Sequence, residues 1–593
     1  MKFIKFLYSL SISFFICFIL NIILTWIAIP YDNKMTLDYL KHRPFWSGTL
    51  VLFLLFNVFF FLRKKIYLII STFIFVLSVG ISYISSIKMD KRSDPLIPQD
   101  IYLIKESWNM AAKYVDTTQI LLFVIGGIFL LLIFFIFLKI KWKSSVAFGL
   151  RLIISIICVS SLFILSNIND DETWNKFGVS NKIRTPFHNL QSNGFVMGNF
   201  LQLTMMHQQK PKDYSKENTE ELITYYQKKQ NSLVSRSNTN QIKPNIIVLQ
   251  LEAFFDPTTL PNVNFSEDPI PFFHSLQNRF TSGKLGVNVF GAGTANTEFE
   301  VLTSMSLQLF PYETHPFTSH VNQPMDSVAH QLKKYGYTTS GLHNNVGWFY
   351  KREDVYPRLG IDYAMFSDKM KNAEFVYDVP GVPKDYVLFD KIIQRTQETK
   401  GKDFVLGITM ELHGPYALWY GHDIKATSNV LPQEHVDILE EYAYKINEVD
   451  KALNKLINFY ENSKEPTMIV MYGDHLPWLG DDRIVYYETG YDDKSESIEN
   501  HDRMYSTPFL IWDNYRNKGK ENINLGSSFL MPYVLEENGI KGNGLHSFLQ
   551  DKMNDGIYQL PPVNYQQQAG WTKTALQQYQ YLQYYYLNEQ PSK

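Results

Sequence analysis

The run NIIVLQLE (245–252) is apolar almost throughout and ends in an acid. Such a run is typical of a strand that is buried on both faces of a sheet. Three similar runs follow along the chain, TTSGLH (338–343), DFVLGITM (403–410) and TMIVMYGD (467–474). Helical patterns lie between these runs, among them a long amphipathic one at about 434–460. The alternation of strands and helices predicts an α/β sheet with helices on both faces.

Polar side chains stand at or just after the ends of these runs: Glu252, His343, His413, Asp474 and His475. Sites in parallel α/β sheets form at the carboxyl ends of strands. The pair Asp474 and His475 suits a divalent ion such as Zn²⁺ or Mn²⁺, and the alternative is a turn aspartate that caps the next helix. Glu252 is costly to bury unpaired, so it either joins a salt bridge or contacts a metal. If the first and fourth runs are neighbours in a parallel sheet, Glu252 converges with that pair.

The segment GAGTANTEFE (291–300) places a threonine at the start of a predicted helix. Gly291 and Gly293 permit a tight turn, so Thr294 is at or next to the N-cap, where threonine often caps a helix. The functional alternative is a nucleophile. Its hydroxyl then needs a metal or a base to lower its pKa, and the helix N-terminus stabilises negative charge there. Glu298 is predicted to support the turn or to pair with a cation, and it is not assigned to the metal.

The first third of the chain is strongly apolar and predicts a membrane domain. A transmembrane helix needs about 20 mostly apolar residues. The apolar stretch at the N-terminus is too long for a signal peptide. Lysine and arginine alternate between the apolar stretches so that the N-terminus is predicted to be cytoplasmic, and an odd number of spans places the remainder outside the cell. The five predicted spans are residues 3–29, 45–62, 66–87, 119–138 and 147–165.

The chain is therefore predicted to consist of a transmembrane domain (1–168), a partly helical extracellular linker (169–243), a catalytic domain (244–550) and a C-terminal tail (551–593). Its 56 basic and 58 acidic residues give a net charge of −2, which does not favour a nucleic-acid partner. The only two cysteines lie in the apolar part, so the external part has neither a disulfide nor a thiolate metal site. A cysteine-free external domain suits a bacterial surface, particularly a Gram-positive one.

Five motifs in order resemble the lipoteichoic acid synthase family of phosphoglycerol transferases, within the sulfatase and alkaline phosphatase superfamily. They are NIIVLQLE, GAGTANTEFE, LHNNVGWFYKR, MELHGPY and MYGDHLP. The resemblance covers nearly the whole chain, because that family also has five N-terminal spans before an external catalytic domain. It implies a five-helix transmembrane bundle joined to an extracellular α/β sulfatase-like domain.

The resemblance also implies roles for individual residues. The metal ligands would be Glu252, Thr294, Asp474 and His475, with Mn²⁺ the usual ion and Mg²⁺ or Zn²⁺ as alternatives. Thr294 would be the nucleophile, with Arg352 and His413 as further catalytic groups. The residues around the phosphoglycerol group would be His343, Phe349, Tyr350, Arg352 and His413.

Some of these residues have a simpler interpretation. From its neighbours YKRED, Arg352 is predicted to be a surface charge, and His343 and His413 are equally consistent with hydrogen-bonded core histidines. Tyr350 stands where the best-known members of the family have tryptophan, and GTANTEFE replaces a segment that contains lysine in those members. These two differences concern the acceptor rather than the basic chemistry.

The resemblance implies a function, namely transfer of sn-glycerol-1-phosphate from phosphatidylglycerol to a poly(glycerol phosphate) lipoteichoic acid chain on a glycolipid. A phospho-threonine intermediate forms and diacylglycerol is released. The alternatives are a phosphoglycerol or phosphoethanolamine transferase that decorates a surface polysaccharide or glycolipid, and an inactive scaffold with the same fold. A sulfatase normally needs cysteine or serine at the position of Thr294. The protein is predicted to lie in the cell membrane with several spans, with proteolytic release of the external domain left open.

Overall fold

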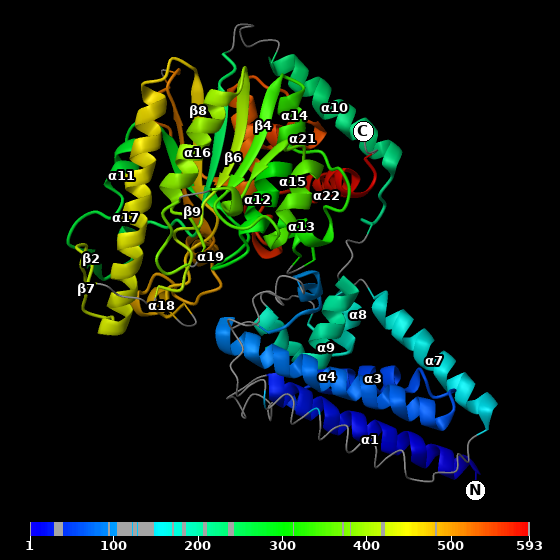
Figure 1. Cartoon of the computed structure of the whole chain (residues 1–593). Helices are drawn as coiled ribbons and strands as arrows, with labels where there is room; N and C mark the ends of the chain where they lie inside the picture. Colours follow the sequence, from blue (N-terminus) through cyan, green and yellow to red (C-terminus); the bar gives the residue numbers. More distant parts are fainter. Residues whose placement is uncertain are drawn as a thin grey trace. The chain divides into compact units, whose positions relative to one another are not determined.

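A computed structural model gives the structure of the chain (Figure 1). The chain divides into two units, Met1–Gln209 with Pro311–Thr314 and Lys210–Phe310 with His315–Lys593, and each is treated by itself. The structure describes residues 2–28, 39–92, 95–103, 121, 127, 147–168, 171–180, 186–205, 210–234, 242–311, 314–370, 373–379, 381–416, 421–480, 483–516 and 518–590.

The first unit is helical. Three of its stretches are long and apolar enough to cross a membrane, namely Leu10–Ala28, Lys65–Met89 and Phe148–Ser166. The predicted N-terminal apolar helices are thus confirmed. Its elements are α1 (Lys2–Ala28), α3 (Arg43–Asn57), α4 (Lys64–Arg92), η1 (Pro98–Leu103), α7 (Phe148–Ser166), α8 (Asp171–Lys176) and α9 (Pro186–Met205).

Two of the five predicted spans have a different outcome. The helix in the second, α3, has only 15 residues, fewer than the roughly 20 that a span needs. The fourth, 119–138, lies outside the described residues apart from Leu121 and Gly127. The count of five therefore stays a prediction. Large apolar side chains such as Phe15, Phe73 and Phe163 are more than half exposed, which suits contact with lipid.

The second unit is built on an eight-stranded sheet with the order β10-β3-β9-β8-β1-β6-β4-β5. The four apolar runs form its neighbouring central strands β8, β1, β6 and β4, all parallel. β9 runs antiparallel to both β8 and β3. The strands are β1 (Asn245–Leu251), β3 (Thr281–Gly286), β4 (Tyr337–His343), β5 (Tyr363–Met365), β6 (Lys402–Ile408), β8 (Thr467–Gly473), β9 (Ser506–Asp513) and β10 (Leu525–Gly526), and β2 (Val263–Phe265) pairs with β7 (Ala426–Ser428) in a small second sheet.

Helices cover both faces of the large sheet, as predicted (Figure 1). Alternate residues of β1 enter two separate cores: Ile246 and Val248 pack with one, and Ile247 and Leu249 with the other. The first core is completed by α12 (Thr294–Thr303), α14 (Val328–Lys333), α15 (Arg352–Arg358), α20 (Ser527–Glu537), α21 (Gly544–Asn554) and α22 (Lys573–Asn588). The second is completed by α11 (Pro271–Gln277), α16 (Asp385–Glu398), α17 (Gln433–Glu461), α18 (Ile484–Thr489) and α19 (Ile498–Met504).

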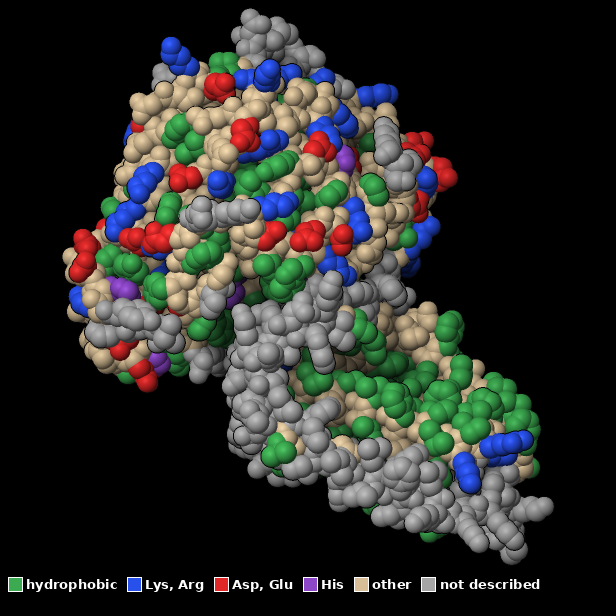
Figure 2. All heavy atoms as spheres, viewed as in Figure 1, with side chains coloured by type: hydrophobic (Ala, Val, Ile, Leu, Met, Phe, Trp, Pro, Cys, Tyr) green, Lys and Arg blue, Asp and Glu red, His purple; other side chains and the backbone are tan. Residues whose placement is uncertain are grey.

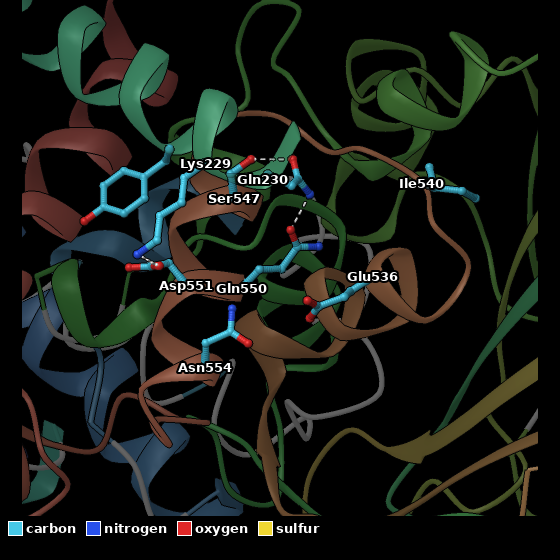
Figure 3. Close-up of a pocket in the computed structure, with 9 residues that line it drawn as sticks. Lys229, Gln230, Glu536, Ile540, Ser547, Gln550, Asp551 and Asn554 are labelled. Atoms are coloured by element: carbon cyan, nitrogen blue, oxygen red, sulfur yellow. Dashed lines mark hydrogen bonds and ion pairs between the residues drawn. The ribbon is translucent and has the colours of Figure 1, made fainter. Parts of the chain in front are cut away.

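Two helices outside the predicted catalytic domain also belong to this unit. α10 (Lys216–Val234) lies within the predicted linker and packs on α21, where Gln230 hydrogen-bonds Gln550 and Ser547 and Lys229 pairs with Asp551 (Figure 3). α22 lies within the predicted tail, yet its Tyr579 is fully buried in the core. Both helices therefore extend the α/β domain.

The surface of the second unit differs from that of the first. On the face in Figure 2, acidic and basic side chains are interspersed over the second unit, whereas the described surface of the first is mostly hydrophobic. These are the surfaces expected of a water-soluble domain and of a unit that contacts lipid.

Candidate active site

Three side chains meet where β1 and β8 end. Leu251 pairs with Gly473 in the parallel register, so Glu252 and Asp474 leave the sheet side by side. Ligand atoms of Glu252, Asp474 and His475 all lie within 4.8 Å of one another, and all three residues are buried. His475 Nε2 is 3.6 Å from Glu252 Oε1 and 3.5 Å from Asp474 Oδ2. The sequence predicted that Glu252 would meet Asp474 and His475 if the first and fourth apolar runs were neighbouring strands. These runs are β1 and β8, which are neighbours, and the three residues lie together.

Backbone contacts orient these side chains. Asp474 Oδ1 accepts hydrogen bonds from the backbone N–H groups of Ala253 (2.8 Å) and His475 (2.9 Å). His475 Nδ1 donates to the carbonyl oxygen of Leu476 at 2.9 Å, which leaves Nε2 facing the two carboxylates. When Nε2 is deprotonated, its lone pair can bind a cation. Asp474 Oδ2 and His475 Nε2 are buried without a hydrogen-bond partner among the residues that the structure describes.

The electrostatics of the cluster fit a divalent cation. Burial raises the pKa of Asp474 to about 7, and the neighbouring Glu252 adds to that rise. Burial also raises the pKa of Glu252, although His475 opposes the shift. Two buried carboxylates side by side are costly, and a cation between them removes that cost. Carboxylate and imidazole together are a usual donor set for Mn²⁺ or Zn²⁺. The residues present therefore fit a metal ion.

Thr294 joins this cluster from α12. It is the first residue of the helix, and the N-cap is Gly293, so Thr294 lies next to the cap and is not the cap itself. Gly293 has a φ of 93°, and a Cβ there would lie 2.9 Å from Val289 Cγ1, so glycine is required. The Thr294 hydroxyl donates to Glu252 Oε2 at 3.0 Å. The hydroxyl therefore points at the carboxylate cluster and does not cap the helix.

Arg352 is buried, not a surface charge. Its side chain is 1% exposed, and Nε and Nη2 donate to Glu298 Oε2 at 3.0 and 2.9 Å. The prediction from its charged neighbours is wrong, because a carboxylate 54 positions earlier in the chain compensates the buried charge. Glu298 pairs with a cation, which is one of its two predicted roles. Burial raises the pKa of Glu298, and Arg352 opposes that shift.

The two predicted histidines have different environments. His343, at the end of β4, is buried, and its Nδ1 donates to the carbonyl oxygen of Ile408 at 2.9 Å. Its pKa is lowered well below the usual value by burial and by Arg352, so it is neutral. Its Nε2 has no partner within the described part of the chain and is a free acceptor. His413 is exposed, which excludes a core role, and its Nδ1 lies 2.6 Å from the carbonyl oxygen of Gly414.

The two predicted aromatic residues lie beside Arg352. The rings of Phe349 and Tyr350 are half-buried with centroids 4.5 Å apart, and Arg352 Cζ lies 5.4 Å from the Tyr350 centroid. Tyr350 and Lys351 have φ angles of 54° and 56°, which are unfavourable for residues with side chains. Strained backbone of this kind is common at functional sites.

A second group of buried polar residues lies near His413, and none of its members was among the site residues predicted from the sequence. Lys445 on α17 is 1% exposed; it pairs with Asp378 at 2.8 Å and donates to the carbonyl oxygen of His413 at 3.2 Å. Asp385 on α16 is also buried and bonds the backbone just before His413. The available signal was Lys445, a charge that interrupts the buried face of the amphipathic pattern at about 434–460 and therefore needs a partner.

Comparison with known proteins gives the family. The family model described as Sulfatase matches residues 244–540. The chain belongs to the sulfatase family. The family predicted from the five ordered motifs is therefore confirmed at this level. The matched residues include all of the metal-type cluster, Thr294, Arg352 and both histidines.

Individual proteins resemble the chain over different lengths. A Rhizobium meliloti protein named for cyclic β-1,2-glucan modification is 27% identical over 623 residues, covering 98% of this chain and 91% of the relative. The Streptococcus pyogenes phosphoglycerol transferase GacH in complex with sn-glycerol-1-phosphate shares the fold, with a TM-score of 0.53 and 23% identity over 64% of this chain and 94% of GacH. The lipoteichoic acid synthase LtaP of Listeria monocytogenes is 24% identical over 54% of this chain and 81% of LtaP, with a TM-score of 0.42.

Proposed function

We propose that this protein is a metal-dependent transferase that moves sn-glycerol-1-phosphate from phosphatidylglycerol to an acceptor hydroxyl through a phospho-threonine intermediate on Thr294. The observation that carries the proposal is the hydrogen bond from the Thr294 hydroxyl to Glu252 inside a buried cluster with Asp474 and His475. A threonine hydroxyl directed at a cation site, at the first residue of a helix, is the arrangement that activates a poor nucleophile for attack on a phosphorus atom.

Glu252, Thr294, Asp474 and His475 would hold the ion, for which we propose Mn²⁺, with Mg²⁺ or Zn²⁺ as alternatives. When bound, the ion lowers the pKa of a hydroxyl and polarises a phosphoryl oxygen. Membership of the sulfatase family and the fit of the donor set support this assignment.

Each of the proposed site residues has its own role in the reaction. With the ion bound, the Thr294 hydroxyl would lose its proton to solvent. The Thr294 oxygen then forms a bond to phosphorus while the bond from phosphorus to the diacylglycerol oxygen breaks. Arg352 supplies positive charge to the phosphoryl oxygens, and neutral His343 accepts a hydrogen bond from a glycerol hydroxyl. His413, which is exposed, donates a proton to the leaving diacylglycerol and takes one from the acceptor hydroxyl in the second step. That hydroxyl attacks phosphorus and restores Thr294. Phe349 and Tyr350, which lie beside Arg352, would contact the glycerol group.

The proposal includes two alternative acceptors for the phosphoglycerol group. The motif resemblance favours a glycolipid-anchored poly(glycerol phosphate) chain, as in lipoteichoic acid synthesis. The Rhizobium meliloti relative, which aligns over 98% of this chain and is named for glucan modification, favours a saccharide acceptor. Phosphoethanolamine is the alternative group for transfer. We propose a cell-membrane location with five spans and an external catalytic domain, which places the site beside a lipid donor.

The test of the function uses the full-length protein in detergent with Mn²⁺ and phosphatidylglycerol labelled in the glycerol headgroup. Parallel reactions contain poly(glycerol phosphate) glycolipid, cyclic β-glucan or no acceptor, and a further one replaces the donor by phosphatidylethanolamine. We expect diacylglycerol release with phosphatidylglycerol, and label on one of the two acceptors. Release only from phosphatidylethanolamine would replace the proposed donor, and no release from either lipid would refute the function.

The pairing of Arg352 with Glu298 gives a prediction with a matched control. Glu298→Gln removes the charge that holds Arg352, and kcat/KM for diacylglycerol release should fall about 10- to 100-fold, because hydrogen bonds between charged groups contribute about 1.5–3 kcal/mol each. Glu300 is the control, because it is also buried on α12 but bonds Asn288, Leu307 and Ser527 instead. Glu300→Gln should keep kcat/KM within about threefold. Equal losses in two variants of equal thermal stability would show that Glu298 has no special role.

A further inference from the structure

Asp385 joins two chain segments that carry the histidines of the candidate site. It is the first residue of α16 and is fully buried. Its Oδ1 accepts three hydrogen bonds: from Asn344 Nδ2 at 2.8 Å and from the backbone N–H groups of Met410 at 3.1 Å and Glu411 at 3.2 Å. In return, the backbone N–H of Asp385 donates to Glu411 Oε2 at 2.8 Å.

The partners of Asp385 stand next to the two histidines. Asn344 directly follows His343 at the end of β4. Met410 follows the end of β6, and its carbonyl oxygen accepts a hydrogen bond from the backbone N–H of His413 at 3.0 Å. One carboxylate oxygen therefore fixes the chain at both strand ends, one residue from the first histidine and three residues from the second.

The backbone of His413 is held from a second direction. Lys445 Nζ donates to the His413 carbonyl oxygen, and Asp378 neutralises Lys445 within a pair that is at most 3% exposed. The imidazole of His413 is exposed even though its backbone is bonded on both sides. This combination suits a group that must meet a substrate in a fixed orientation.

The polar group around Asp385 lowers the stability of the fold, so stability alone does not explain its presence. Asp385 Oδ2 and Asn344 Oδ1 are buried with no hydrogen-bond partner in the described ranges. Burial raises the pKa of Asp385, and burial together with Asp385 raises the pKa of Glu411. Two neighbouring buried carboxyl groups with raised pKa values destabilise the fold, and a turn of this kind can form without them. Such groups are enriched at functional sites.

We infer that Asp385 is a positioning residue for the transfer reaction, which sets the placement of His343 and His413 relative to each other. The inference rests on the proposed function, and it adds a residue that does not touch the reacting atoms. Asp385 acts through Asn344 on one side and through the turn from Met410 to His413 on the other.

The test compares three variants of the full-length, Mn²⁺-loaded protein. Asp385→Ala removes the acceptor, so kcat for diacylglycerol release should fall about 100-fold with KM within about threefold of wild type, because small misplacements of catalytic groups carry losses of this size. Asp385→Asn keeps an acceptor oxygen and should recover kcat to within about fivefold of wild type. Asn344→Ala removes one of the three donors and should lower kcat about tenfold.

Asp450 provides the matched control. It is a buried aspartate on α17 that accepts the backbone N–H groups of Phe272 at 2.9 Å and Phe273 at 2.8 Å, and burial raises its pKa to about 6. Asp450→Ala should lower the melting temperature by as much as Asp385→Ala yet keep kcat within about threefold, because it also removes a buried carboxylate that accepts two backbone N–H groups, but at the start of α11 and not beside the histidines.

The outcomes separate the inference from the proposed function. If wild type releases diacylglycerol and Asp385→Ala and Asn344→Ala both keep wild-type kcat, the inference is overturned and the function stands. The inference is also overturned, and the function stands, if Asp450→Ala lowers kcat as much as Asp385→Ala does. If Asp385→Ala does not fold, Asn344→Ala decides alone, since only a positioning role predicts its loss of kcat at unchanged KM. If wild type itself releases no diacylglycerol, the function fails and the inference with it.

Discussion

Thr294→Ala is expected to lower the rate of diacylglycerol release at least about 10⁴-fold, because loss of the nucleophile leaves only binding and electrostatic effects. Thr294→Ser keeps a hydroxyl and should retain between about 1% and 10% of the rate, since the missing methyl group loosens the position of the oxygen against Glu252. The measurement is the initial rate at which the full-length protein with Mn²⁺ releases diacylglycerol from phosphatidylglycerol that is labelled in its acyl chains.

The control for this result is Thr303→Ala. Thr303 is the last residue of the same helix, is buried, and donates its hydroxyl to the carbonyl oxygen of Phe299 at 2.7 Å. Its loss should change the rate by no more than about threefold, because the hydroxyl bonds only backbone groups, the carbonyl oxygen of Phe299 and the N–H of Met305. A Thr294→Ala variant that keeps a tenth of the wild-type rate would remove Thr294 from the mechanism.

Glu252→Gln is expected to lower the transfer rate at least about 10³-fold and to abolish stabilisation by Mn²⁺. Ligand at 100 times its Kd raises the unfolding free energy of wild type by about 2.7 kcal/mol. Without metal, we expect the opposite difference in melting temperature. Glu252→Gln should then melt at a higher temperature than wild type, because it removes one of two buried carboxylates whose charges repel each other. The measurement is thermal unfolding with Mn²⁺ and with chelator.

The same cluster fixes the sign of a pH dependence. Burial raises the pKa of Asp474 to about 7 in the metal-free fold, above its usual value. A carboxyl group with a raised pKa contributes stability at low pH, and this contribution is lost as the pH rises through the folded-state pKa. The cluster should therefore lower the stability of metal-free wild type between about pH 4 and pH 7, the interval between the usual and the raised pKa of Asp474. Stabilisation by Mn²⁺ should grow over the same range, because metal ligands must be deprotonated.

Glu300→Gln is the control for both results, since Glu300 is buried, with a pKa that burial raises to about 7, and it lies outside the cluster. It should keep the full shift in melting temperature with Mn²⁺. An equal shift in wild type and Glu252→Gln would show that Mn²⁺ binds elsewhere.

The sequence predicts the centre of the fold well because its strands are buried on both faces. Each becomes a continuous apolar run, as in NIIVLQLE, and the acid that ends the run is conspicuous. The site could be predicted for the same reason, since Glu252, Asp474 and His475 follow such runs directly. The position of Thr294 at the start of α12 could also be predicted, because Gly291 and Gly293 mark the tight turn before this helix.

Other features depend on partners distant in the chain. The charge of Arg352 predicts exposure, and only its contact with Glu298 explains its burial. Asp385 bonds mainly backbone N–H groups, which every residue has, so no residue pattern marks the interaction. The Tyr- and Gln-rich end of the chain has the composition of a loose tail, and its helix α22 is ordered by packing of residues such as Tyr579 against the core. The strands β10 and β3, which are the last two at one end of the sheet, are too short or too polar to give a clear apolar run.

The measurement that tests the central claim most directly is the location of the phosphoglycerol group on the protein during turnover. Wild type is mixed with Mn²⁺ and headgroup-labelled phosphatidylglycerol without acceptor, quenched in acid, digested and analysed by mass spectrometry. We expect the label on the peptide that contains Thr294, with its loss when acceptor is added before the quench. Label on any other residue, or release of diacylglycerol with no label on the protein at any time, would contradict the account.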